Sequence, residues 1–167
     1  MKVLVDTNVL ISAARDPRGV PYRAFIKATT HPNTGYLTDQ NIEELRRVFQ
    51  RKWPKEIEIL NHFLALMSGI RTIPTPAVES GKELLIRDIA DRPILRAALA
   101  ADIDVILTGD KDFLESEVVR PQMLAPAQFL RQNDISSKLK KGERSIAEGN
   151  TIEGFSSLKK IRDKHDL

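Results

Sequence analysis

KVLVDTNVLIS, at residues 2–12, brings a run of apolar residues directly up to an acid. Residues 2–5 predict a short buried strand, and Asp6, Thr7 and Asn8 follow at its end. An aspartate after a strand often caps the next helix by accepting a hydrogen bond from the helix backbone. The other interpretation is that Asp6 is held at the strand end to bind a ligand, and this stretch alone does not choose between the two.

The alternation of strand and helix continues along the chain. Further strands are expected at residues 36–38, 70–74, 104–108 and 122–124. Helical segments are expected at 8–15, 20–30, 40–52 (capped by Asp39), 54–69 and 91–103, with a short helix after Pro126. This order predicts an α/β layer fold with a mainly parallel sheet. Ligands of such folds bind outside the carboxyl ends of the strands.

The composition limits the kinds of protein and of site that the chain can form. Its 167 residues suit one domain, with 41% hydrophobic and 29% charged residues. No apolar run approaches the roughly 20 residues of a membrane helix, and we find no signal peptide, so we expect a cytoplasmic protein. Because there is no cysteine and the three histidines are far apart, a metal would be held by oxygen, which favours Mg²⁺ or Mn²⁺ over Zn²⁺.

The net charge of +3 belongs to the C-terminal end of the chain. From Arg131 onward there are nine Lys or Arg and six Asp or Glu, so the residues before it carry no net charge. We therefore expect one domain at residues 1–131 and a basic C-terminal extension at residues 132–167.

Several acids are expected at one edge of the sheet. Asp6 follows the first strand and Asp110 follows the fourth, so parallel strands would bring both acids to the carboxyl edge. Glu43 and Glu44 lie in the first turn of the helix after the second strand, again at that edge. At about 100° per residue, Glu44 lies nearer the border of the apolar helix face than Glu43, so we expect Glu44 to turn inward.

The edge at which Asp91 lies does not follow from spacing. Asp91 begins the helix that leads into the fourth strand, and a simple crossover would place it at the edge opposite Asp6. However, the connection at 74–88 is long enough to contain a helix of its own. Considered alone, Asp91 is more readily explained as a cap or first-turn acid than as part of a site.

Four segments together resemble the PIN-domain family of metal-dependent ribonucleases, over about residues 1–131. They are VDTNVLIS at 5–12, LTDQNIEELRRVF at 37–49, DIADRPILRAALAADIDVILTGDKDF at 88–113 and LAPAQFL at 124–130. The DTN of the first segment is common by itself, whereas the order and spacing of the first three segments form a strong joint signal. The likeness is to the VapC-like branch, the toxins of bacterial toxin–antitoxin pairs.

The resemblance implies a three-layer α/β/α fold and a site for Mg²⁺ or Mn²⁺. The positions that match the family's catalytic, metal-binding acids are Asp6, Glu44, Asp91 and Asp110. The matching supporting residues are Thr7, Asn8, Thr108 and the auxiliary acid Asp112. The implied reaction is cleavage of single-stranded RNA by metal-activated water. The resemblance also implies a homodimer and a cognate antitoxin protein as partner.

A basic run follows the acid of the third helix. It consists of Arg46, Arg47, Arg51 and Lys52. Such a run is usually a solvated helix face, but here it continues from Glu44 and could hold the RNA backbone. Phosphate contacts of that kind would make RNA binding strongly dependent on salt.

Other functions stay open at this point. A PIN-like domain can bind RNA without cutting it, although the intact acids argue against that. A receiver-type domain that handles phosphate also clusters aspartates after strands, but it usually needs a lysine at a strand end, and Lys111 is poorly placed for this role. The extension could be a basic arm that binds RNA, could pack on a neighbouring molecule, or could resemble part of an antitoxin, so that Lys140 or Arg144 reaches the acids.

Overall fold

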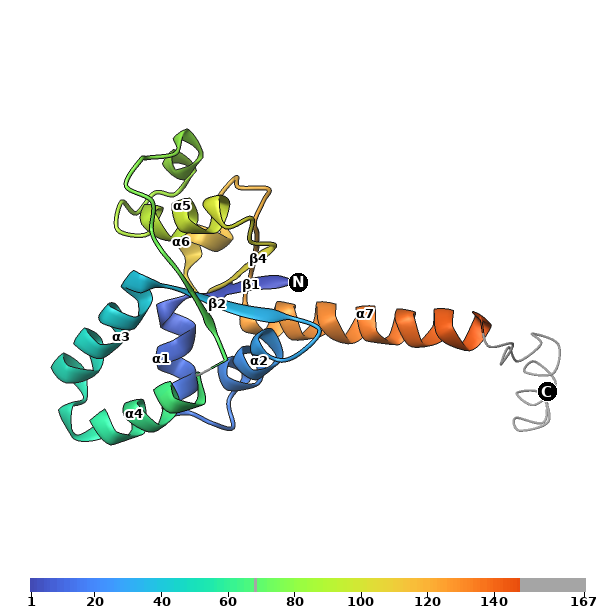
Figure 1. The fold of residues 1–167 in the computed structure, drawn as a ribbon, viewed down its shortest axis with the longest axis horizontal. Helices are drawn as coiled ribbons and strands as arrows, with labels where there is room; N and C mark the ends of the chain where they lie inside the picture. Colours follow the sequence, from blue (N-terminus) through green and yellow to red (C-terminus); the bar gives the residue numbers. More distant parts are fainter. Residues whose placement is uncertain (68, 148–167) are drawn as a thin grey trace. The chain divides into compact units, whose positions relative to one another are not determined.

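The structure is a computed structural model, and it describes residues 1–67 and 69–147. Strands and helices alternate along most of the chain (Figure 1). In chain order the elements are β1 (Lys2–Val5), α1 (Thr7–Arg15), α2 (Val20–Thr29), β2 (Thr34–Thr38), α3 (Asp39–Lys52), the 3₁₀ helix η1 (Pro54–Glu56), α4 (Ile57–Leu66), β3 (Arg71–Ile73), the 3₁₀ helix η2 (Gly81–Leu85), α5 (Arg92–Ala100), β4 (Val105–Leu107), α6 (Lys111–Leu114), β5 (Gln122–Leu124) and α7 (Pro126–Ala147).

All five strands lie in one sheet, in the order β3-β2-β1-β4-β5, and each pairs in parallel with its neighbours. β1 is central: Leu4 lies opposite Tyr36 of β2 on one side and Ile106 of β4 on the other. Because every strand runs in the same direction, all carboxyl ends meet at one edge. The predicted α/β fold with a parallel sheet is confirmed.

Each face of the sheet packs against its own layer of helices. Val3 and Val5 of β1 lie in a core with buried residues of α1 to α4, such as Leu10 and Phe49. Leu4, between them in sequence, points to the opposite face and packs with residues of α5 and α6. Figure 1 shows the two helix layers on either side of the strands. The predicted three-layer arrangement follows from this alternation of side chains along buried strands.

Two helix starts differ from the sequence prediction. The N-cap of α3 is Thr38, not Asp39: the Thr38 hydroxyl accepts a hydrogen bond from the backbone N–H of Asn41, and Asp39 is the first helical residue. The segment expected as one helix over 54–69 begins with η1 and continues as α4 from Ile57.

The edge at which Asp91 lies, which the sequence left open, is the carboxyl edge, opposite to the one that the simple crossover argument favoured. α5 begins directly after Asp91 and leads into β4, so it runs from the carboxyl edge back to the amino edge of the sheet. A helix that connects parallel strands is antiparallel to them, and its first residues therefore lie at the edge where Asp6 lies. The connection over 74–88 contains only the short η2.

The last described helix is longer than expected. α7 runs from Pro126 to Ala147, whereas the sequence predicted only a short helix after Pro126. The chain divides into two compact units at Met1–Leu130 and Arg131–Leu167, and α7 crosses this boundary. Residues 148–167 and the Lys140 side chain lie outside what the structure describes, so the hypotheses about the extension stay predictions. Within residues 1–67 and 69–147, no helix is long and apolar enough to cross a membrane.

Candidate active site

Asp6 lies at the carboxyl end of β1 and is almost completely buried, with 5% of its surface exposed. One carboxylate oxygen, Oδ1, accepts a hydrogen bond from the Thr7 backbone N–H at 2.6 Å. The other, Oδ2, accepts from the Thr108 hydroxyl at 2.6 Å and from Asn8 Nδ2 at 2.8 Å. Asp6 is also the N-cap of α1. It therefore both caps a helix and stands in a polar site.

The ends of β1 and β4 are joined by side-chain hydrogen bonds. The Thr108 hydroxyl donates to Asp6 and accepts from the Asp110 backbone N–H at 3.0 Å. Asn8 donates to Asp6 through Nδ2 and accepts from the Gly109 N–H through Oδ1, also at 3.0 Å. Thr108 and Asn8 thus fix the position of Asp6 relative to the loop that carries Asp110.

Glu44 and Asp91 lie on opposite walls of a cleft at the same edge of the sheet. The cleft has a volume of about 440 Å³. Its lining residues are Gln40, Asn41, Glu43, Glu44 and Arg47 of α3, with Ala90, Asp91 and Ile94 from the start of α5. Glu44 is half-buried and Glu43 is exposed, as the helical spacing predicted. The structure therefore brings Asp91 to the predicted acids.

Burial and the charges of neighbouring acids raise the pKa values of Asp6 and Asp91. Burial raises the pKa of Asp6 to about 6; hydrogen bonds from Thr108 and Thr7 oppose the rise, and the charges of Glu44 and Asp110 add to it. Burial also raises the pKa of Asp91, to about 7, with further contributions from Asp6, Asp110, Asp88 and Glu44. A nearby negative charge disfavours the ionised form of a carboxyl group, so these shifts indicate that the acids lie close to one another.

The donor set suits a hard divalent cation, because it consists of carboxylate oxygens with hydroxyl and amide groups nearby. A cation would also offset the repulsion that raises the pKa of Asp6 and Asp91. Over the described residues, however, no three Asp, Glu, His or Cys side chains lie close enough to enclose an ion. Electrostatic repulsion extends further than a metal–ligand bond, so the two observations agree: the acids lie near enough to affect the pKa values of Asp6 and Asp91, but they are not closed around one point.

Asp112 is held by a residue that the sequence analysis did not single out. Its carboxylate pairs with Arg87 Nη2 at 2.7 Å, and Arg87 also pairs with Glu115 at 3.3 Å. The Asp112 backbone N–H donates to Asp110 Oδ1 at 2.8 Å. Asp112 therefore adjoins Asp110 through its backbone, while its side chain binds an arginine.

A second residue that the sequence analysis missed is Asn41, which is buried at 1% exposure and joins the ends of β1 and β2. Its amide donates to the Thr7 hydroxyl at 2.8 Å and accepts from Thr38. The signal for it was present, since Asn41 lies four residues before Leu45 and eight before Phe49, on the buried face of α3.

The basic run of α3 does not form one site. Arg46, Arg47, Arg51 and Lys52 are all exposed, and only Arg47 lines the acidic cleft. Arg46 lines a separate hollow, formed with residues of β2, α4 and β3. Lys52 lies near the Trp53 ring, at 6.0 Å from the ring centre. Of these four residues, Arg47 is the one placed to bind a molecule at the acids.

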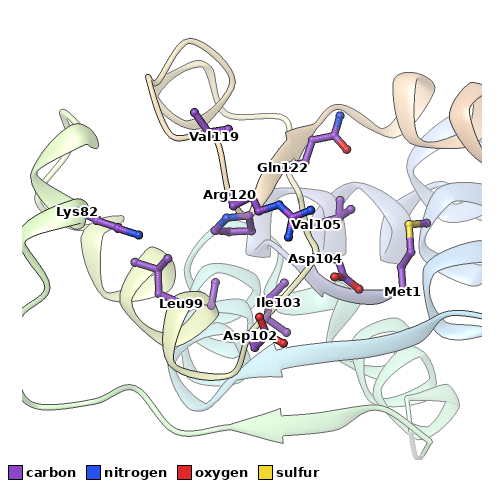
Figure 2. A pocket seen from close by; sticks show the side chains of 12 residues that line it. Met1, Lys82, Leu99, Asp102, Ile103, Asp104, Val105, Val119, Arg120 and Gln122 are labelled. Atoms are coloured by element: carbon purple, nitrogen blue, oxygen red, sulfur yellow. The ribbon is translucent and has the colours of Figure 1, made fainter.

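A larger hollow, of about 580 Å³, lies at the amino edge of the sheet, away from the acids. Figure 2 shows Lys82, Arg120 and Gln122 on its walls, with Asp102 and Asp104 below them and Met1 at one end. None of the predicted site residues lines it. Its charged side chains are of both signs and are exposed to solvent, so they do not form a site for one kind of ligand. The larger volume alone does not make this hollow the functional site.

The chain has relatives among known proteins. A family model described as PIN domain matches residues 2–112. The uncharacterized protein MJ1680 of Methanocaldococcus jannaschii is 24% identical over 115 residues, which cover 68% of this chain and 74% of that protein.

Solved structures share the fold at low sequence identity. A chain of VapBC2 from Rickettsia felis, solved with a DNA fragment from its promoter, has a TM-score of 0.59 at 16% identity, covering 75% of this chain and 98% of that one. The toxin VapC20 of Mycobacterium tuberculosis, described as cleaving the sarcin–ricin loop, has a TM-score of 0.51 at 13% identity, covering 70% and 96%. Since the family model spans more than half of the sequence and these structures share its architecture, the chain belongs to the PIN-domain family.

Proposed function

We propose that this protein is an endoribonuclease that uses Mg²⁺ or Mn²⁺ to cleave single-stranded RNA. One observation carries the proposal: four acids lie close enough at the carboxyl edge of the sheet for their charges to raise the pKa values of two of them. The four are Asp6, Glu44, Asp91 and Asp110, and the raised values are those of Asp6 and Asp91. In parallel α/β folds this is the edge at which ligands bind. Membership of a family whose domains are generally nucleases supports the same function.

The side chains have separate tasks in this proposal. The four acids bind the cation through their carboxylate oxygens, while Thr108 and Asn8 keep Asp6 in its orientation. A divalent cation bound there would lower the pKa of a water molecule and offset charge on the scissile phosphate. Arg47, exposed on the wall of the cleft, contacts the RNA backbone beside the acids. Asp112 acts through its neighbour Asp110 and holds Arg87.

The biological role that we infer is that of a toxin. The fold is shared with VapC20, which is described as a toxin that cleaves the sarcin–ricin loop, and with a chain of VapBC2. From this likeness we infer that the protein pairs with a cognate antitoxin protein. Action on cytoplasmic RNA and formation of a homodimer are proposed from the family resemblance in the sequence alone.

One alternative has a specific observation in its favour. A catalytically silent PIN-like module would bind RNA without cutting it, and the described acids are not closed around a common point. A receiver-type domain is less well supported, because Lys111 is the first residue of α6 and is exposed. Phosphorylation of an aspartate by a phosphate donor would support that function.

The decisive experiment is cleavage of a mixed-sequence single-stranded RNA in Mg²⁺, Mn²⁺ or EDTA. We expect cutting in either metal, none in EDTA, and none by the Asp6→Asn variant. The matched control is Asp102→Asn, an acid with 99% side-chain exposure and a φ of 51°, a conformation that Asn tolerates. If the wild-type protein and a variant without residues 136–167 both bind RNA and leave it intact in both metals, the nuclease proposal is wrong and the silent module is correct.

A further inference from the structure

Asn41 is a buried side chain whose hydrogen bonds join two strand ends. Its Oδ1 accepts from the Thr38 backbone N–H at 2.9 Å and from the Thr38 hydroxyl at 2.8 Å. Its own backbone N–H donates to the Thr38 hydroxyl at 3.1 Å. These contacts form a capping box that fixes the first turn of α3 to the end of β2.

The remaining contact of Asn41 leaves this helix and reaches the acid site. Because Oδ1 already accepts two hydrogen bonds, Nδ2 is the atom that donates to the Thr7 hydroxyl, at 2.8 Å. The backbone N–H of Thr7 in turn donates to Asp6 Oδ1. Two hydrogen bonds, joined through the covalent frame of Thr7, therefore connect the start of α3 to Asp6.

Glu44 depends on the same helix start. It lies three residues after Asn41, so the two side chains are neighbours on the helix surface, and both line the acidic cleft. A change in the position of the first turn of α3 would move Glu44 relative to Asp6. A capping box alone would hold the helix on β2, whereas the bond to Thr7 also holds it on the start of α1, just after β1.

We propose that Asn41 is a positioning residue that sets the separation of Glu44 and Asp6 for a divalent cation. The inference rests on the proposed metal-dependent function and concerns how the site is built. Asn41 is not itself a ligand here, because its Oδ1 is already bound to Thr38. Residues that orient metal ligands typically change metal affinity by about 10- to 100-fold when removed.

The test is Mn²⁺ affinity, measured by titration calorimetry without RNA on the full-length Asn41→Ala variant. We expect binding that is about 10- to 100-fold weaker than in the wild type. The matched control is Asn33→Ala. Asn33 is also a buried asparagine, at 6% exposure, and donates to the Lys27 carbonyl at 2.9 Å, but it lies just before β2 at the opposite edge of the sheet. Its removal should leave Mn²⁺ affinity unchanged.

The outcomes separate a positioning role from a merely structural one. Equal affinity in Asn41→Ala and the wild type overturns the inference, as does an equal loss of affinity in both variants or a wild type that does not bind Mn²⁺. Circular dichroism confirms that each variant is folded at the temperature of the titration; if Asn41→Ala is not, Asn41→Ser and Asn33→Ser are compared by the same criteria. If the wild type binds Mn²⁺ but does not cut RNA, the proposed function is contradicted. The inference about Asn41 is then still decided by the Mn²⁺ affinities of the variants.

Discussion

At the scale of the residue, Asp6 must remain ionisable where almost no solvent reaches it. Its burial and the charges of Glu44 and Asp110 raise its pKa, and the hydrogen bonds from Thr108 and Thr7 limit the rise to about 6. At pH 7 Asp6 is therefore mostly charged, whereas Asp91, with a pKa of about 7, is half protonated. Cation binding near neutral pH should accordingly release a proton, and the affinity should rise with pH.

The Asp91→Asn variant tests the raised pKa of Asp91, which is caused first by burial and then by the charges of the neighbouring acids. The pKa of Asp91 is higher in the folded protein than in the unfolded chain, so the folded state binds more protons and loses stability as pH rises from about 4 to about 7. Without metal, we expect the variant to be about 1–2 kcal/mol more stable than the wild type at pH 8, after allowing for solvent screening of this half-buried group.

Urea unfolding in EDTA at pH 4 and pH 8 measures this difference, which should vanish at pH 4. The same variant should have no nuclease activity. Equal stability at pH 8 would show that burial and the neighbouring acids do not raise the pKa of Asp91. Asp102→Asn controls for removal of an exposed acid.

At the scale of the element, the long connection between β3 and α5 depends on one buried ion pair. Arg96 Nε and Nη2 bind the two carboxylate oxygens of Glu83 at 2.7 and 2.8 Å, and Arg96 Nη1 donates to the Pro76 carbonyl at 2.8 Å. Glu83 also accepts from the Ser80 backbone N–H. These contacts tie the connection to α5, whose first turn follows Asp91.

Breaking this pair should destabilise the protein more than removal of a surface acid. In Glu83→Gln the Arg96 guanidinium keeps its charge and loses its ionic partner, and we expect the Tm at pH 7 to fall by about 5 °C or more. Glu79→Gln, at an exposed position in the same connection, removes a charge that acts on Arg96 without forming a salt bridge with it, and should lower the Tm far less. The pKa of Glu83 is lowered mainly by its hydrogen bond with Arg96, so the wild type should lose this stabilisation as the pH falls and the carboxylate is protonated. Equal Tm values for both variants would contradict this role.

The elements differ in how far the sequence could predict them. β1 and β4 are continuous apolar runs followed by acids, a local pattern that identifies both the strand and the edge at which Asp6 and Asp110 lie. The partners of Asp112 and Glu83 could not be predicted, because Arg87 and Arg96 reach them through tertiary folding rather than through helical or strand spacing. Asn41 was predictable in part: a polar residue on an apolar helix face indicates a buried hydrogen bond, but not its partner.

At the scale of the whole molecule, the charge is divided between a neutral domain and a basic C-terminal end. The domain core includes the start of α7, where Phe129 is fully buried. Residues 136–167 carry eight Lys or Arg and five Asp or Glu, so removing them leaves a chain with no net charge. The truncation retains Phe129 and Leu130, and with them the core on that face of the sheet.

Deletion of residues 136–167 should therefore weaken RNA binding and leave cleavage at saturating RNA unchanged. Each lysine or arginine that binds a phosphate releases counterions, so the plot of log affinity against log salt should become less steep by about 0.7 for every phosphate of single-stranded RNA that the deleted residues neutralise. Fluorescence anisotropy over a range of salt concentrations measures both the affinity and this slope. An unchanged slope would rule out a basic arm, and faster cleavage by the truncated protein would show instead that the extension inhibits the acidic site.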